Sequence, residues 1–115
     1  MKKEIKIILL GNPISNNHIY KTHGHIVYLS KEGKDLKEQY QWQAKAQYKG
    51  EPLLGRLKVS VDLYFGDKRK RDIDNFGKLW QDSFNGIVWL DDSQIEKITI
   101  EKHYDKNSPR VEIII

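Results

Sequence analysis

The chain contains no cysteine, which excludes disulfide bonds and thiolate metal sites and suits a reducing compartment. It also has little continuous apolar sequence near its start, where the apolar stretch Ile7–Leu10 is only four residues long. A signal peptide needs an apolar run of about 7–15 residues and a membrane helix needs about 20. We therefore expect a soluble, cytoplasmic protein without a membrane partner.

Internal repeats, low-complexity tracts and a Pro/Gly linker are absent as well, so the 115 residues are expected to form one domain, 1–115. A domain of this size buries only about two-thirds of its unfolded surface, so a dimer interface would help to stabilise it. The excess of charge is small: 20 Lys and Arg face 16 Asp and Glu, a net charge of +4. Such a balance permits a polyanionic partner without demanding one.

The hydrophobic pattern predicts an α+β fold with a mixed sheet of about four strands and two helices, in the order β-loop-α-β-α-β-β. Helices are expected at 31–49, with Ser30 as N-cap, and at 75–86. Strands are expected at 4–10, 57–65, 94–103 and 110–115, and the loop 11–29 contains a short extended piece at 26–28. The turn Asn107–Pro109 predicts that the last two strands form a hairpin.

Apolar residues mark the faces that these elements bury. In the first helix the apolar stripe is Leu36, Tyr40 and Ala44. In the second, residues three and four apart form one buried face: Ile73, Phe76, Trp80, Phe84 and Ile87. Trp42 is expected in a core or an interface, with stacking on nucleic-acid bases as the alternative.

The segment 68–78 carries the most chemical information. Four consecutive cations, Lys68–Arg71, end where a D-x-D pair begins at the predicted start of the second helix. Asp72 and Asp74 point to the same side only if the backbone there is extended, which places Asp74 at or beside the N-cap. Lys78 follows one turn later on the same face, and Asp82 lies a further turn on, where we expect it to be solvated.

A second acidic pair, Asp91 and Asp92, follows Trp89 and Leu90. Neighbouring residues of an extended chain face opposite ways, so one of the two can join Asp72 and Asp74. Three carboxylates at one point repel each other, and a hard divalent cation such as Mg²⁺ removes that cost. In this pattern the metal supplies hydroxide for phosphodiester hydrolysis, while Lys78 stabilises or protonates the leaving group. The alternative is that the aspartates cap a helix and the cations are a solvated loop.

Two motifs resemble the RusA family of Holliday-junction resolvases, which are small bacterial and phage-borne enzymes. These are R-D-I-D-N-x-x-K at Arg71–Lys78 and W-L-D-D at Trp89–Asp92. Upstream, Pro13-x-Ser15-Asn16-Asn17 is similar to an early segment of the family, and Ser30-x-Glu32-Gly33 to the opening of its first helix. The resemblance covers nearly the whole chain.

The resemblance implies a homodimer that needs Mg²⁺, or Mn²⁺ in its place, and makes paired symmetric nicks in DNA four-way junctions. It carries the family's catalytic, metal-binding carboxylates onto Asp72, Asp74 and Asp92, and its essential lysine onto Lys78. No small-molecule cofactor is implied. The chain departs from the family pattern at Asn12, where a proline is usual, at Gly77, and in a mixed Lys/Arg basic run.

The expected DNA contacts surround these residues. They are Lys68, Arg69, Lys70, Arg71, Asn75, Asn16, Asn17, Lys21 and His23. The two nicks in opposed strands give dimerisation a physical reason, because a two-fold dimer presents two sites. The apolar end, Val111–Ile115, is a candidate edge strand for that dimer.

Two other functions remain open from the sequence. A non-catalytic module would bind junctions through its basic residues, with affinity that falls steeply with salt and with no metal-dependent cleavage. A nuclease of broader specificity would cut other branched or flapped DNA.

Overall fold

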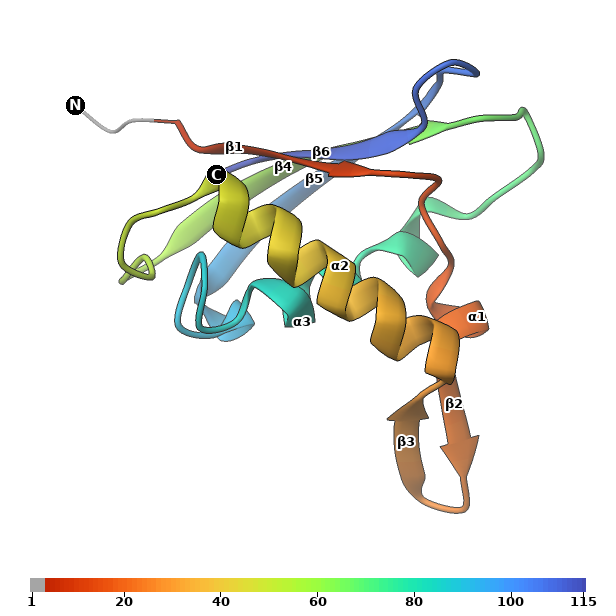
Figure 1. The fold of residues 1–115 in the computed structure, drawn as a ribbon, viewed down its shortest axis with the longest axis horizontal. Coiled ribbons are helices and arrows are strands. Elements are labelled where there is room, and N and C mark those ends of the chain that lie inside the picture. The colour runs from red at the N-terminus through yellow and green to blue at the C-terminus, as the bar shows by residue number, and fades with distance from the viewer. Residues whose placement is uncertain (1–3) are drawn as a thin grey trace.

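The computed structural model describes residues 4–115. Its elements follow the predicted order, with additions in the N-terminal third (Figure 1). They are β1 (Lys6–Leu10), α1 (Asn16–Ile19), β2 (Tyr20–His23), β3 (Ile26–Leu29), α2 (Lys31–Gln47), β4 (Leu57–Phe65), the 3₁₀ turn η1 (Ile73–Phe76), α3 (Lys78–Phe84), the 3₁₀ turn η2 (Asp92–Gln94), β5 (Ile95–Tyr104) and β6 (Arg110–Ile114).

A mixed four-stranded sheet in the order β1-β6-β4-β5 confirms the predicted α+β class. Helices α2 and α3 lie on one side of this sheet (Figure 1). Alternate side chains of the strands point to that side and form the core with apolar residues of the helices, because successive strand residues face opposite ways. The buried strand residues are Ile7, Leu9, Val59, Val61, Leu63, Phe65, Val111 and Ile113.

The predicted hairpin of the last two strands is wrong. β5 pairs in parallel with one side of β4, while β6 pairs antiparallel with the other side. The connection 105–109 therefore crosses the end of β4, where the Asp105 amide donates to the Phe65 carbonyl. β4 alternates apolar and polar residues most regularly, and the central position buries its apolar face best.

The C-terminal strand is also not a sheet edge, because β6 pairs with both β1 and β4. The edges are β1 and β5. Two glutamines of α2 cover β1: Gln47 bonds both the amide and the carbonyl of Ile8, and Gln43 accepts from the Leu10 amide. The prediction that Val111–Ile115 offers an edge strand to a dimer is therefore wrong.

The predicted loop 11–29 contains more structure than its composition suggested. After the short helix α1, strands β2 and β3 form an antiparallel hairpin that projects away from the rest of the chain (Figure 1). The extended piece predicted at 26–28 makes up the first three residues of β3. Ile19 is fully buried at the base of this hairpin and anchors it to the start of α2.

Helix α2 begins as predicted, with the Ser30 hydroxyl accepting from the Gly33 amide, and ends at Gln47 rather than 49. The second predicted helix, 75–86, is shorter and interrupted. The chain makes the 3₁₀ turn η1, breaks at Gly77 and continues as α3. Glycine is a poor helix former, which accounts for the break at this position. Phe76, Trp80 and Phe84 are buried as predicted, but Ile73 is exposed.

Candidate functional site

The acidic pair Asp72 and Asp74 lies where the extended chain after β4 turns into η1. Asp72 is extended (φ −92°, ψ 120°) and occupies the N-cap position without a side-chain hydrogen bond. Asp74 lies inside the 3₁₀ turn, and Gly77 is the N-cap of α3, so the prediction that Asp74 lies at or beside the N-cap of the second helix is wrong. Both carboxylates are exposed and, among residues 4–115, form no hydrogen bond or ion pair. Neither is engaged in stabilising the fold, which leaves both available to a ligand.

The basic run before this pair is only partly free. Arg71 donates to the Asp67 carboxylate at 2.8 Å and lies over the Phe65 ring, with 20% of its side chain exposed. The hydrogen bond from Arg71, reinforced by the Arg69 amide, holds the pKa of Asp67 below its ordinary value. Lys68 lies over the Tyr104 ring, while Arg69 and Lys70 are exposed. Arg69 and Lys70 are therefore the cations of this run that are best placed to contact a polyanion.

A groove joins the basic run to the N-terminal segment. One wall comes from 13–18 and the other from 69–76, so two stretches that lie far apart in the sequence meet beside Asp72. The groove is lined by Pro13, Ile14, Ser15, His18, Glu32, Arg69, Lys70, Arg71, Asp72, Asn75 and Phe76. Glu32 and His18 form an ion pair at 2.9 Å. The groove contains both cationic and anionic side chains, and its cations Arg69, Lys70 and Arg71 favour a ligand that carries negative charge where it contacts them.

Lys78 lies in the first turn of α3, next to the N-terminal segment. Its backbone amide donates to the Asn16 side-chain oxygen at 3.4 Å. Its ammonium group lies 3.4 Å from the Asp82 carboxylate and 5.0 Å from the centre of the Tyr20 ring. The Tyr20 hydroxyl donates to the same Asp82 oxygen at 2.6 Å. Lys78 is thus held from two sides, and Asp82 is not the free, solvated residue that the sequence suggested.

Asp92 joins this cluster, whereas Asp91 does not. Asp91 accepts from the Ser93 amide and makes a capping box with Gln94 at the start of η2. Burial raises the pKa of Asp92, and the neighbouring Asp82 carboxyl adds to that rise, while Lys78 opposes it. Burial and the bond to Asp82 likewise raise the pKa of Tyr20, and Asp92 contributes through its charge. The pair divides as expected into one aspartate that faces the cluster and one that does not, because Asp91 caps η2 while Asp92 lies within that turn.

Among residues 4–115, one group of three His, Asp or Glu side chains is close enough to hold a metal ion, with all ligand atoms within 4.8 Å of one another. This group is Asp62, Glu101 and His103. The carboxylates of Asp72, Asp74 and Asp92 do not meet that criterion together. Asp72 precedes η1 and Asp74 lies in it, whereas Asp92 begins η2 and has Asp82 and Lys78 beside it. All three offer oxygen ligands, the donor type that Mg²⁺ and Mn²⁺ prefer. The donor chemistry therefore suits a hard divalent ion.

Other expected DNA contacts are spread more widely. Lys21 and His23 are exposed on β2 of the projecting hairpin, and Asn17 is exposed on α1. Asn75 lines the groove and is partly buried. Sequence reasoning missed the contact of Tyr20 with Asp82. The i, i+4 spacing of Lys78 and Asp82 was a usable signal, but nothing in the sequence linked Tyr20 to a residue 62 positions away.

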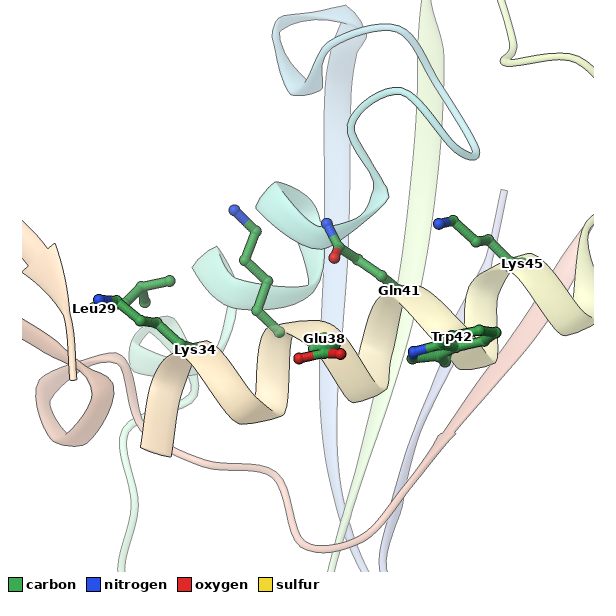
Figure 2. Close-up of a pocket in the computed structure, with 7 residues that line it drawn as sticks. Leu29, Lys34, Glu38, Gln41, Trp42 and Lys45 are labelled. Carbon is green, nitrogen blue, oxygen red and sulfur yellow. The ribbon is translucent and has the colours of Figure 1, made fainter. Parts of the chain in front are cut away.

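A second hollow lies on the outer face of α2 (Figure 2). It is lined by Leu29, Lys34, Lys37, Glu38, Gln41, Trp42 and Lys45. Trp42 is 69% exposed, so of the two expected places, a core or an interface, the core is excluded, and a place in an interface stays a prediction. The lysines around it, Lys34, Lys37 and Lys45, give this face a positive character, and Asp72 is not among its lining residues. Within residues 4–115, no helix is both long and apolar enough to cross a membrane.

Comparison with known proteins shows which family of proteins the sequence matches. Residues 11–115 match the family model described as endodeoxyribonuclease RusA. The chain is 28% identical over 112 residues to the crossover junction endodeoxyribonuclease of Enterobacteria phage 82, covering 94% of this chain and 91% of that protein. The protein of the same name from Escherichia coli K12 is 28% identical over 109 residues, with the same coverage.

A shorter match points to an uncharacterised protein of Bacillus subtilis, YqaN, which is 39% identical over 46 residues, 40% of this chain and 32% of that protein. The two crossover junction endodeoxyribonucleases match nearly from end to end, so the resemblance inferred from the D-x-D-N-x-x-K and W-L-D-D motifs is confirmed.

Proposed function

The chain belongs to the RusA family of endodeoxyribonucleases, and on that basis we propose that it resolves DNA four-way junctions by a pair of symmetric, metal-dependent nicks. The observation that supports this most strongly is the meeting of Lys78 with Asp82 and Asp92, on a part of the chain that follows the basic run Lys68–Arg71 in the sequence. Phosphodiester cleavage needs an anion-binding surface, carboxylates for a metal and a cation at the developing charge. The groove supplies Arg69, Lys70 and Asp72, and the cluster around Lys78 supplies the cation and Asp92.

Asp72, Asp74 and Asp92 would hold the divalent ion, Mg²⁺ or Mn²⁺. When bound, such an ion activates water and neutralises charge on the scissile phosphate. The three carboxylates suit a divalent ion by their chemistry. Among residues 4–115, those of Asp72 and Asp74 have no side-chain partner, and that of Asp92 lies beside the like charge of Asp82. Crowded carboxylates repel one another, so a cation among them relieves that repulsion.

The protein's own residues would do the remaining work. Arg69, Lys70 and Asn75 would bind the DNA backbone in the groove beside Asp72 and so orient a phosphate toward the carboxylates. Lys78 would stabilise the charge that develops on the leaving oxygen, or donate a proton to it. Lys68, Arg71, Asn16, Asn17, Lys21 and His23 remain proposed DNA contacts. Arg71 would have to leave Asp67, or act with it, to reach a phosphate.

A homodimer is part of this proposal, because two opposed strands must be cut and one chain carries one site. Glutamine side chains of α2 cover the β1 edge of the sheet, so β5 is the edge open to a second copy. We propose a cytoplasmic setting in a bacterium or in a phage-infected cell, where such junctions arise during recombination and repair.

The test is cleavage of a labelled four-way junction beside a linear duplex and a flapped duplex of the same sequence, with Mg²⁺ or Mn²⁺. We expect paired nicks in the junction, and Asp74→Asn should lower the rate about 100-fold or more, since a metal contributes several kcal/mol to phosphoryl chemistry. Asp35→Asn is the matched control, an exposed aspartate of α2 that is not among the residues lining the groove. Equal cutting of all three substrates would indicate the broader nuclease, and binding without cleavage would indicate the non-catalytic module.

A further inference from the structure

The ammonium group of Lys78 is held by two side chains, Tyr20 and Asp82, that lie outside the motifs quoted for the family resemblance. We propose that Tyr20 and Asp82 are positioning residues, which act on phosphodiester cleavage through Lys78. This inference rests on the proposed function, because it assigns them a role in that same reaction.

The contacts form a closed set. Asp82 follows Lys78 by one helical turn, and one oxygen of its carboxylate, Oδ2, takes both the Lys78 ion pair at 3.4 Å and the Tyr20 hydroxyl at 2.6 Å. The face of the Tyr20 ring lies 5.0 Å from the Lys78 ammonium group. Each of the three side chains therefore touches the other two, and a shift of one displaces the lysine.

The same N-terminal segment reaches α3 at a second point. Tyr20 begins β2 directly after α1, and Asn16, the first residue of α1, accepts from the backbone amide of Lys78. The backbone and the side chain of Lys78 are thus both tied to residues 16–20. This arrangement fixes the lysine relative to the groove that the N-terminal segment lines.

Stability alone does not account for this cluster. An i, i+4 ion pair on a helix contributes little, and the Lys78 side chain is 53% exposed, so solvent screens it. An unrestrained lysine samples many rotamers, and losing that freedom before the reaction is a recognised source of rate acceleration. Tyr20 and Asp82 restrict those rotamers while they leave the ammonium group accessible to a phosphate.

The experiment compares Asp82→Asn and Tyr20→Phe with the unmodified protein in single-turnover junction cleavage, with junction binding measured separately in EDTA. We expect the cleavage rate to fall about 10- to 100-fold for Asp82→Asn and about tenfold for Tyr20→Phe, since small misplacements of a reacting group have effects of this size. Binding should change less than about twofold, because neither residue contacts DNA in this proposal. Asp82→Glu should recover part of the lost rate.

A double-mutant cycle separates positioning from a merely structural role. If Asp82 and Tyr20 act through Lys78, then Lys78→Ala with Asp82→Asn will be no slower than Lys78→Ala alone, and likewise for Tyr20→Phe. Rate losses that multiply in the double variants would overturn the proposal. So would cleavage at the unmodified rate by both single variants.

Matched controls are available in the same chain. Asp105→Asn removes a carboxylate that is ion-paired with Arg110 elsewhere, and Tyr48→Phe removes a phenol that donates to the Glu51 carbonyl. Both should cleave at the unmodified rate. If Asp82→Asn does not fold, Tyr20→Phe alone decides the question through its own cycle. Absence of cleavage by the unmodified protein would count against the proposed function, whereas cleavage that depends on Asp74 but not on Tyr20 or Asp82 would overturn this inference only.

Discussion

Replacing Trp89 with phenylalanine tests how the turn that carries Asp92 is anchored. Trp89 is fully buried, and its indole N–H donates to the Asn85 side-chain oxygen at 2.8 Å. Its rings pack against Phe84 and Trp80, with ring centres 5.4 Å and 6.3 Å away. The backbone carbonyl of Trp89 also accepts from the Gly86 amide, so the residue closes the segment between α3 and η2.

The expected magnitude follows from these contacts. Trp89→Phe removes the equivalent of two to three buried carbon groups, at about 0.8 kcal/mol each, or about 2 kcal/mol. It also removes one hydrogen bond, at about 1 kcal/mol, because Asn85 is partly accessible and water can replace the indole. The free energy of unfolding should fall by about 3 kcal/mol, and the melting temperature by about 10 °C.

Urea unfolding followed by far-ultraviolet circular dichroism measures this change, with the denaturant slope expected to stay constant. Trp42→Phe is the matched control, since the same substitution at a side chain that is 69% exposed should alter stability by less than about 0.5 kcal/mol. If the two variants have the same stability, the reasoning from burial and hydrogen bonding is refuted.

Two further predictions concern the sheet and the N-terminal segment. Arg110 donates to the carboxylates of Glu112 at 2.6 Å and of Asp105 at 2.8 Å. Burial raises the pKa of Glu112, but its partners Arg110 and Lys6 outweigh burial and hold this pKa below its ordinary value of 4.5. The hydrogen bond from Arg110 likewise lowers the pKa of Asp105. A carboxyl group whose pKa is lowered in the folded state stabilises the fold above its ordinary pKa, and this stabilisation is lost as the pH falls. Arg110→Met should therefore destabilise the protein at neutral pH. The difference in urea midpoint between this variant and the unmodified protein should shrink below pH 4.5. Gly33→Ala would place a Cβ 3.0 Å from both the Cβ and the carbonyl oxygen of Ile19, so thermal unfolding should show a loss of about 1–2 kcal/mol despite the better helix propensity of alanine.

Each of these two predictions has a control variant at another position of the same chain. Arg56→Met removes an ion pair with Glu96 in which the arginine side chain is 85% exposed, and it should show little dependence on acid. Gly77→Ala meets only the flexible end of Gln81, at 3.4 Å, and should not be destabilising. A difference for Arg110→Met that persists in acid, or a Gly33→Ala variant as stable as the parent, would contradict the respective argument.

The candidate site was partly accessible from the sequence. The D-x-D pair, Lys78 and the W-L-D-D turn follow from motif and spacing, and the structure brings Lys78 and Asp92 to one cluster. The contact between Tyr20 and Asp82 was not accessible from the sequence. A phenol that bonds a carboxylate 62 residues later leaves no periodic trace in either segment, because the contact depends on where the hairpin base meets α3.

Local sequence determined the elements themselves. The alternation of Leu57–Phe65 made a strand, Ser30 and the apolar stripe after it made a helix, and the missing cysteines and long apolar runs left a hydrophobic core as the means of stabilisation. Tertiary structure decided how those elements combine: β5 and β6 took opposite sides of β4 instead of pairing, and Tyr20 at the base of the hairpin came to bond Asp82 of α3. The physical reason is that hydrophobic period specifies which face of an element is buried, whereas its neighbours are chosen by the packing of the whole core.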